Sequence, residues 1–145
     1  MNIPEQTIYG EPIDLDFPNT GLENNKKMIY QTVMVYFDSM YESNPIKLKK
    51  VFHSNATITG YMSTRLVENN LTDYAEFIAL QRPSAYETKD PKFIEILSLK
   101  VAGDTAFALV RIGIWGKTFL DTLTFIRVDQ GWLIYNKLFH IEASD

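Results

Sequence analysis

The residues of this sequence with the clearest potential for chemistry lie in its second half, on runs that alternate like β-strands. Asp121 and Lys137 fall on the same side of neighbouring runs, as diagonal neighbours. A carboxylate and an ammonium group in this arrangement form a cross-strand ion pair, which is the simplest interpretation. If these two side chains face a cavity instead, they form an acid–base pair that could move protons, and an enzyme becomes more plausible.

Arg111 is a second candidate, because its neighbours on the same side of the run are mostly apolar. An unpaired guanidinium group is costly in such surroundings, so we expect Arg111 to have an anionic partner. That partner is either a ligand or a carboxylate of the protein, unless the side chain lies at an exposed cavity mouth.

Metal and cofactor chemistry has little support in the sequence. His53 and His140 are the two histidines, far apart, and cysteine is absent. Neither histidine has the two-histidine spacing of a metal site, and thiolate ligands and disulfides are excluded. We therefore expect no metal and no cofactor. His53 either lines the mouth of a pocket or lies at a helix end, and His140 is expected on the sheet surface.

Composition indicates one globular domain. The chain has 145 residues, 46% of them hydrophobic, and a formal net charge of −4 with both signs interspersed. Such a surface does not attract nucleic acid, and no apolar run is long enough to span a membrane. We expect a cytoplasmic protein. Residues 1–19 contain three prolines and no helical period, which predicts an extended arm, followed by one domain over 20–145.

Three helices are expected in the first half. Thr20 and Glu23 fit a capping box that starts a helix of about 22 residues. Asn44 and Pro45 end that helix and begin a short second one, with asparagine as the cap. Thr72 is expected to cap a third helix. The apolar residues of the first helix recur at steps of three and four, which predicts one buried face: Ile29, Val33, Tyr36, Phe37 and Met40.

From Phe93 onward the period changes to two, and turn signals separate four predicted strands. A smaller strand pair is expected over 56–67. Helices followed by an antiparallel sheet indicate an α+β domain with helices on one sheet face. The four predicted strands cover residues 93–102, 105–115, 117–128 and 132–142.

The turns allow the two faces of the sheet to be assigned. A two-residue turn at Gly116 and Lys117 places Arg111 opposite Thr122, and a three-residue loop over 129–131 places Thr124 opposite Asn136. An error of one residue in either turn would exchange part of the faces. The first face, expected toward the cavity, carries Leu109, Arg111, Trp115, Thr122, Thr124, Trp132, Ile134, Asn136 and Leu138. The opposite face carries Ile112, Phe119, Asp121, Leu123, Phe125, Tyr135, Lys137 and Phe139.

The second of these faces is too apolar to remain exposed, so we expect a homodimer formed sheet to sheet. The aromatic residues Tyr36, Tyr61, Trp115 and Trp132 are typical of a core, although an aromatic lining with few polar groups is also what a small-molecule pocket requires.

Two parts of the sequence carry a resemblance to a known family. Residues 52–57 read Phe-His-Ser-Asn-Ala-Thr, and residues 101–106 read Val-Ala-Gly-Asp-Thr-Ala, followed by Asp121, a Gly-Trp pair at 131–132 and an Asn-Lys pair at 136–137. The pattern resembles the nuclear transport factor two-like superfamily and its putative lumazine-binding subgroup over residues 22–142. The resemblance implies a cone-shaped barrel, in which a curved antiparallel sheet wraps around three N-terminal helices and encloses a pocket.

Ketosteroid isomerase is a member of the same superfamily, and its motif aligns with the first part of this sequence. The alignment implies that Tyr36 matches the tyrosine that donates to the substrate oxyanion. Gly60 falls on the general-base aspartate, and Thr124 falls on the neutral carboxylic acid. Glycine cannot accept a proton and threonine cannot act as a carboxylic acid, so the resemblance argues against that isomerase mechanism.

We therefore expect a small-molecule-binding domain with a mostly apolar, aromatic-lined cavity and an aromatic or anionic organic ligand. One alternative is an enzyme of the cyclase, dehydratase or isomerase type, in which His53 or the Asp121–Lys137 pair moves the proton. Another is a protein-interaction module that uses the apolar sheet face. The predicted ligand-binding residues are Tyr36, His53, Tyr61, Arg111, Trp115, Thr122, Thr124 and Asn136.

Overall fold

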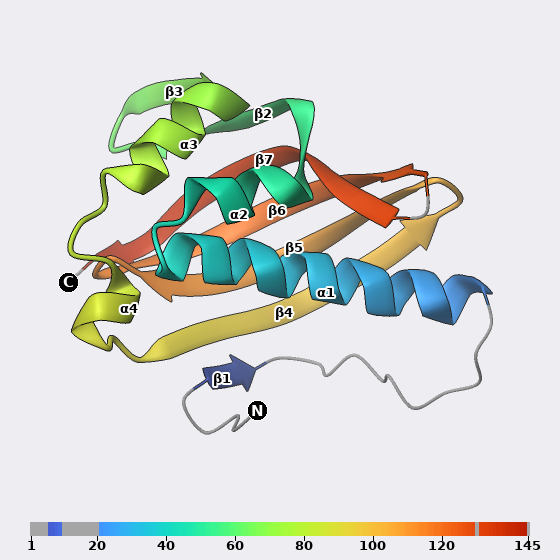
Figure 1. The fold of residues 1–145 in the computed structure, drawn as a ribbon, viewed down its shortest axis with the longest axis horizontal. Helices are drawn as coiled ribbons and strands as arrows, with labels where there is room; N and C mark the ends of the chain where they lie inside the picture. Colours follow the sequence, from blue (N-terminus) through green and yellow to red (C-terminus); the bar gives the residue numbers. More distant parts are fainter. Residues whose placement is uncertain (1–5, 10–20, 130, 145) are drawn as a thin grey trace.

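A computed structural model describes residues 6–9, 21–129 and 131–144 of the chain (Figure 1). Its helices are α1 (Gly21–Tyr41), α2 (Pro45–Val51), α3 (Leu71–Ala79) and α4 (Ala85–Thr88). Its strands are β1 (Gln6–Tyr9), β2 (Phe52–Met62), β3 (Arg65–Asn70), β4 (Lys92–Ala102), β5 (Thr105–Ile114), β6 (Lys117–Val128) and β7 (Gly131–Ser144). The cap predicted at Thr20 and most of the predicted arm lie outside the described residues.

The strands form one curved, open sheet in the order β1-β4-β5-β6-β7-β2-β3. Strands β4 to β7 are an antiparallel meander, as predicted. The sheet is mixed rather than wholly antiparallel, because β2 runs parallel to β7 and β1 runs parallel to β4. The α+β class is confirmed, with β1 and β3 at the two edges of the sheet.

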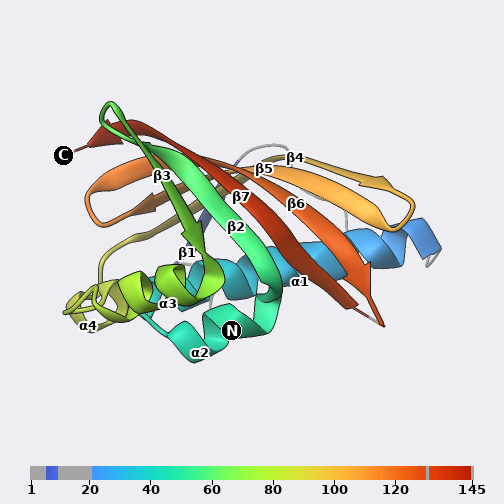
Figure 2. The same cartoon turned by 90° about the horizontal axis from the view of Figure 1, so that it is seen from above.

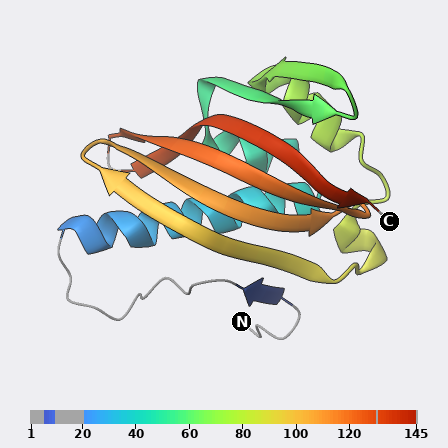
Figure 3. The same cartoon turned by 180° about the vertical axis from the view of Figure 1, so that it is seen from behind.

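All helices lie on one face of the sheet, and Figure 2 shows the strands arching over them. Seen from behind, β4 to β7 lie in front of α1 with no helix on the near side (Figure 3). The apolar stripe of α1 packs against this sheet, and Ile29, Val33, Tyr36 and Phe37 are all 0% exposed. Complete burial of an apolar side chain contributes about 1.5–3 kcal/mol, so the stripe is a major source of stability. Within the described ranges, no helix is long and apolar enough to cross a membrane.

The helix starts follow side-chain caps. Asn44 caps α2 as predicted, since its Oδ1 accepts a hydrogen bond from the Lys47 backbone N–H at 3.0 Å. For α3 the cap is Asn70 rather than the predicted Thr72, and its Oδ1 accepts from the Asp73 N–H at 2.8 Å. Strand β3 leads directly into α3, so the cap is the last residue of the strand and Thr72 lies inside the first turn.

The hairpin between β5 and β6 turns one residue earlier than predicted. Trp115 and Gly116 form the loop with φ of 56° and 72°, and Ile114 pairs with Lys117. Positive φ at both positions is the geometry of a tight hairpin turn that matches strand twist. The register consequently shifts by two residues, so Arg111 lies opposite Leu120 instead of Thr122. A shift of two leaves the strand residues on their predicted faces, whereas Trp115, now in the turn, departs from the strand alternation and packs against Phe119 on the face opposite Arg111.

A bulge in β7 changes the second face assignment. Thr124 pairs with Asn136 as predicted, but Phe125 pairs with Ile134, which leaves Tyr135 as the extra residue. One inserted residue reverses the alternation on one side of the bulge. Trp132 and Ile134 therefore lie on the Asp121 face, buried at 3% and 0% exposure, and not with Arg111 as predicted.

The predicted inner and outer faces are reversed. The face with Asp121 and Lys137 packs against the helices, while the face with Arg111 points away from them. Leu123 and Phe125, expected at a dimer interface, are 0% and 2% exposed in the core. The proposed dimer surface is therefore wrong, and the apolar face that suggested a protein-interaction module is the core itself. Homodimerisation by another surface stays a prediction.

Candidate functional site

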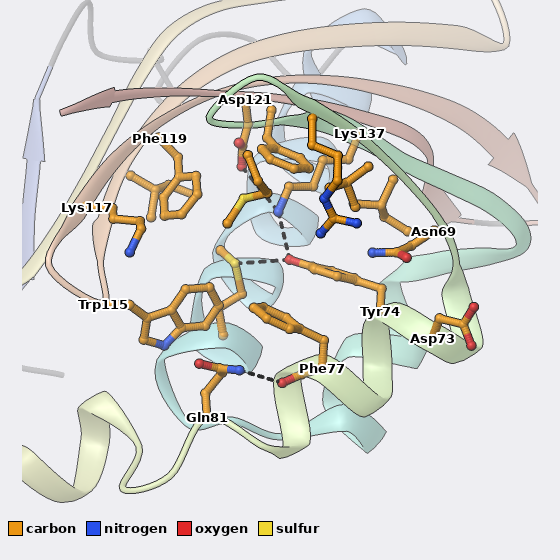
Figure 4. A pocket seen from close by; sticks show the side chains of 17 residues that line it. Asn69, Asp73, Tyr74, Phe77, Gln81, Trp115, Lys117, Phe119, Asp121 and Lys137 are labelled. Atoms are coloured by element: carbon orange, nitrogen blue, oxygen red, sulfur yellow. Dashed lines mark hydrogen bonds and ion pairs between the residues drawn. The ribbon is translucent and has the colours of Figure 1, made fainter. Parts of the chain in front are cut away.

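A cavity of about 450 Å³ lies between α3, the β2–β3 hairpin and the inner face of β6 and β7 (Figure 4). Its walls are largely aromatic, and its polar side chains form two groups. Asp121 and Lys137 are almost completely buried, whereas the other polar side chains belong to β3, α3 and the start of β6. The aromatic lining residues are Tyr74, Phe77, Trp115, Phe119 and Phe139. The second polar group is Arg65, Asn69, Asp73, Gln81 and Lys117.

Simple periodicities bring these side chains together. Phe119 and Asp121 alternate inward along β6, and Lys137 and Phe139 do the same along β7. Successive residues of a strand point to opposite faces, so each second residue reaches the cavity. Tyr74 and Phe77 lie three residues apart on α3 and share a helix face. The cavity is therefore built from one helix and the inward sides of paired strands.

Asp121 is the most unusual group in the cavity. Its side chain is 1% exposed, and its Oδ2 accepts a hydrogen bond from the Tyr36 hydroxyl at 2.6 Å. The same Oδ2 lies 3.9 Å from the Lys137 Nζ. Burial raises the pKa of Asp121, while the charge of Lys137 and the hydrogen bond from Tyr36 lower it; the net direction is upward. Among the described residues, Asp121 Oδ1 is buried and has no hydrogen-bond partner.

Lys137 holds its charge inside an aromatic cage. It is 5% exposed, and its Nζ donates to the Tyr74 hydroxyl at 2.7 Å. The Nζ also lies 5.2 Å, 4.6 Å and 5.6 Å from the ring centroids of Tyr36, Tyr74 and Phe139. Burial lowers the pKa of Lys137. The carboxylate of Asp121 and the contacts with Tyr74 together raise this pKa by more than burial lowers it, so the net shift is upward. Lys137 is therefore a charged donor at neutral pH.

Tyr36, on α1, fixes the carboxylate of this pair by a hydrogen bond. It is 0% exposed, and its hydroxyl is committed to Asp121 rather than directed at a ligand. Burial, followed by the nearby charge of Asp121, raises the pKa of Tyr36 well above its usual value. The hydroxyl therefore remains protonated and acts as a fixed donor to the carboxylate.

The comparisons with known proteins decide the family. The model of the putative lumazine-binding family matches residues 24–140. The chain belongs to this family. No curated protein matches it.

Solved structures of NTF2-like proteins of unknown function share the fold of this putative lumazine-binding domain. One from Shewanella baltica has a TM-score of 0.77 at 21% identity and covers 87% of this chain and 100% of its own. One from Silicibacter pomeroyi has a TM-score of 0.76 at 21% identity, with 85% and 100% covered. One from Methylobacillus flagellatus has a TM-score of 0.74 at 22% identity, with 91% and 100% covered. These identities support a shared fold and carry no activity across.

Of the predicted ligand-binding residues, Trp115 lines the cavity of this family member. Its ring makes edge contacts with Phe77 and Phe119, at centroid distances of 5.8 Å and 6.2 Å. The indole Nε1 is buried and has no hydrogen-bond partner among the described residues. Asp121 and Lys137 both line the cavity and lie 3.9 Å apart as an ion pair, so the two side chains face a cavity, and their part in proton transfer stays a prediction.

Arg111 is partnered by the protein itself. On the outer face its guanidinium donates to Glu142, at 2.7 Å from Nε, and to Glu95 through Nη1. The cross-strand register explains the second contact, since Glu95 is directly opposite Arg111 on β4. The expectation that Arg111 lines the cavity was wrong because the two sheet faces are reversed.

The other predicted residues also lie away from this cavity. Asn136 is on the outer face, where its Oδ1 accepts from the Thr57 hydroxyl at 2.6 Å, and Thr122 and Thr124 share that face. His53 packs against the ring of Tyr135, on the bulge, at 5.2 Å. Tyr61 is 58% exposed near the end of β2. The sequence-based prediction missed Tyr74 and Phe77 as wall residues, although both lie on the predicted third helix at a spacing of three residues.

Gly60 lies where the resemblance to ketosteroid isomerase implies a general base. A Cβ at this position would come within 2.5 Å of the Phe139 backbone oxygen and 2.6 Å of its ring. Phe139 pairs with Gly60 across the strands and fills the space that a side chain would need. Any base in this cavity must therefore come from another position. Within the described ranges, no cluster of three acidic or histidine side chains could hold a metal ion.

Proposed function

We propose that this domain binds a small planar heterocycle in the cavity between α3 and the sheet. The supporting observation is that aromatic side chains surround the buried Asp121–Lys137 pair in the cavity. Oδ1 of Asp121 has no hydrogen-bond partner among the described residues. The volume of about 450 Å³ falls in the range of small-molecule sites, and an apolar lining with few polar groups is their usual composition.

The two buried groups define which ligand edge fits. Asp121 Oδ1 is an acceptor and requires a ligand N–H. The Lys137 ammonium uses one N–H on Tyr74, so its remaining donors can meet a ligand carbonyl. A neighbouring N–H and C=O form a lactam edge, and the pyrimidinedione ring of lumazine, with two C=O and two N–H groups, carries such edges. The name of the family supports the same ligand class.

Burial should make this recognition selective. Asp121 and Lys137 are 1% and 5% exposed, so hydrogen bonds to them form in a medium of low polarity and are stronger than at the surface. A ligand that lacks the N–H leaves the carboxylate oxygen unpaired, which costs about 1–3 kcal/mol or more. Trp115, Phe77 and Phe119 supply aromatic surface against which a planar ring can pack.

Thermal unfolding with lumazine tests the proposal. Lumazine should raise the melting temperature of the wild type, since a ligand at about 100 times its Kd stabilises the folded state by about 2.7 kcal/mol. 1,3-Dimethyllumazine, whose ring N–H groups are methylated, should give a clearly smaller rise. Asp121→Asn should lose the difference between the two compounds, whereas Asp73→Asn, at an exposed carboxylate of the same cavity, should retain it.

Equal responses to lumazine and its dimethyl analogue would remove the lactam edge from the proposal. No response to lumazine, riboflavin or related pteridines up to their solubility limits would count against a heterocycle site altogether.

A further inference from the structure

We propose that Asp121 is also a general base, which removes a proton from a neutral planar ligand in the cavity while Lys137 stabilises the negative charge that forms. This activity rests on the proposed function in one respect: the ligand must occupy the same cavity. It adds a reaction class, the proton transfers of isomerases, dehydratases and cyclases, to a site for binding.

The two oxygens of the Asp121 carboxylate have different surroundings. Oδ2 accepts from the Tyr36 hydroxyl at 2.6 Å and lies 3.9 Å from the Lys137 Nζ. Oδ1 has no partner among the described residues, and Asp121 is one of the residues that line the cavity. Figure 4 shows the carboxylate pointing from β6 toward Lys137 and the interior of the cavity. Oδ1 is therefore the atom that can accept a proton from a ligand.

The electrostatic surroundings favour a carboxylate that is both ionised and basic. Burial raises the pKa of Asp121, which strengthens it as a base relative to an exposed aspartate. Lys137 on β7 and Tyr36 on α1 oppose this rise and keep the carboxylate available. Other titratable groups that line the cavity are Tyr74 and Asp73 on α3, Arg65 on β3 and Lys117 on β6.

Lys137 suits the second role. Its pKa is raised by Asp121 and Tyr74 beyond the lowering by burial, so it is an ammonium donor and not a competing base. It lies beside the proton acceptor, at 3.9 Å from Oδ2. A positioned charge in a water-poor site stabilises a developing oxyanion more strongly than the same charge does in water.

The step balances without an oxidant or a cofactor. Asp121 Oδ1 bonds to a hydrogen on the carbon next to a ligand carbonyl, and the C–H bond breaks. Its electron pair forms the enolate, whose negative oxygen accepts a hydrogen bond from Lys137. Return of the proton from Asp121 to a different carbon completes an isomerisation, and departure of a β-leaving group, which takes the proton from Asp121, completes an elimination.

The probe is 5-nitrobenzisoxazole, a neutral planar compound that needs one base. Removal of the proton on C3 turns its electron pair into the third C–N bond, the N–O bond breaks, and the ring opens to one coloured product, a cyanonitrophenolate. General-base catalysis contributes about 10²–10⁴-fold. We expect the wild type to open the ring with saturation kinetics, and Asp121→Asn to lose about 100-fold or more in kcat/KM.

Matched variants separate the proposed roles. Asp73→Asn, a carboxylate on the same cavity, should change kcat/KM by less than about 3-fold if Asp121 is the base. Lys137→Met should move the pH profile of kcat to higher pH, because the pKa of Asp121 rises without the lysine charge, and should also lower the plateau of kcat, because the phenolate oxygen loses its donor. Tyr36→Phe should displace the pH profile of kcat to higher pH, because the Tyr36 hydrogen bond lowers the pKa of Asp121. An unmoved profile would reduce Tyr36 to a packing residue.

The outcomes are decisive even if Asp121→Asn fails to fold. In the wild type alone, kcat should rise with pH as one carboxyl group ionises and then reach a plateau, and lumazine should inhibit competitively. Ring opening that increases further through pH 9–10 would identify a lysine or tyrosine and overturn the proposal. Wild-type activity no greater than that of folded Asp121→Asn would also overturn it, while a lumazine-induced rise in melting temperature would leave the binding function intact.

Discussion

Lys137→Met would remove one charge of the buried pair and keep most of the aliphatic stem in place. The Nζ of Lys137 lies 3.9 Å from Asp121 Oδ2, and at an effective dielectric constant of about 20 this attraction is about 4 kcal/mol. Loss of one partner from a buried pair typically costs about 3–5 kcal/mol. The free energy of unfolding is about 5–15 kcal/mol for a typical domain, so the variant should be strongly destabilised but measurable.

The loss should depend on pH in a defined direction. Without Lys137, the folded-state pKa of Asp121 rises further above its ordinary value of 3.8. The folded variant then binds more protons than the unfolded chain, so its stability falls as pH rises from about 4 toward the folded-state pKa. Protonating an aspartate costs about 1.4 kcal/mol for each pH unit above its ordinary pKa, which limits the loss to about 4 kcal/mol at pH 7 and about 2 kcal/mol at pH 5.

Urea unfolding of the variant and the wild type at both pH values measures these quantities. Lys47→Met is the matched surface control: Lys47 pairs with Glu42 at 2.9 Å with about a third of each side chain exposed, and should cost about 1 kcal/mol or less. The double variant Asp121→Asn with Lys137→Met should be more stable than Lys137→Met at pH 7. A loss under about 1 kcal/mol at pH 7, or an equal loss at both pH values, would refute an ionised buried pair.

Two further substitutions test local packing. Gly60→Ala should lower the free energy of unfolding, measured in urea, by about 2–3 kcal/mol, because its Cβ would meet the Phe139 backbone oxygen at 2.5 Å. A Cβ at Gly131 meets nothing within 4 Å, so Gly131→Ala, the control, should change it by about 0.5 kcal/mol or less. Equal effects of the two variants would mean that Phe139 moves aside freely. Asn44→Ala should cost about 1 kcal/mol through loss of the α2 cap, and Asn44→Gly only a few tenths; a neutral alanine variant would show that the hydrogen bond to Lys47 N–H contributes little.

The strand pattern was largely readable from the sequence because a β-strand has a period of two. The four predicted strands of the second half differ from β4 to β7 by at most two residues at any end. The prediction that Asp121 and Lys137 are diagonal neighbours was correct, because the register of β6 with β7 is the predicted one at Thr124 and Asn136. Trp115 was predicted as a strand residue on the Arg111 face, and it reaches the cavity because it lies in the turn, where its positive φ breaks the strand alternation.

The reversed faces show where periodicity stops being informative. Periodicity divides a strand into two sides, but both sides of this sheet carry leucine and phenylalanine, and only contact with α1 and α3 decides which side is inside. The bulge at Tyr135 is equally invisible, because it depends on how β7 pairs with two neighbours at once. The reversal placed most of the predicted site on the outer face, and the bulge moved Trp132 and Ile134 to the inner one.

The sequence by itself determined the elements, their order, the family and the chemical identity of the acid–lysine pair, because these depend on local spacing and residue type. Tertiary structure decided whether the acid–lysine pair lies on the surface or in a cavity. Packing of helices on one sheet face turned a plain cross-strand ion pair into a buried one, held by Tyr36 from α1 and Tyr74 from α3, residues 85 and 63 positions from their partners in the chain. Burial by distant segments raises the pKa of Asp121, and no local pattern encodes it.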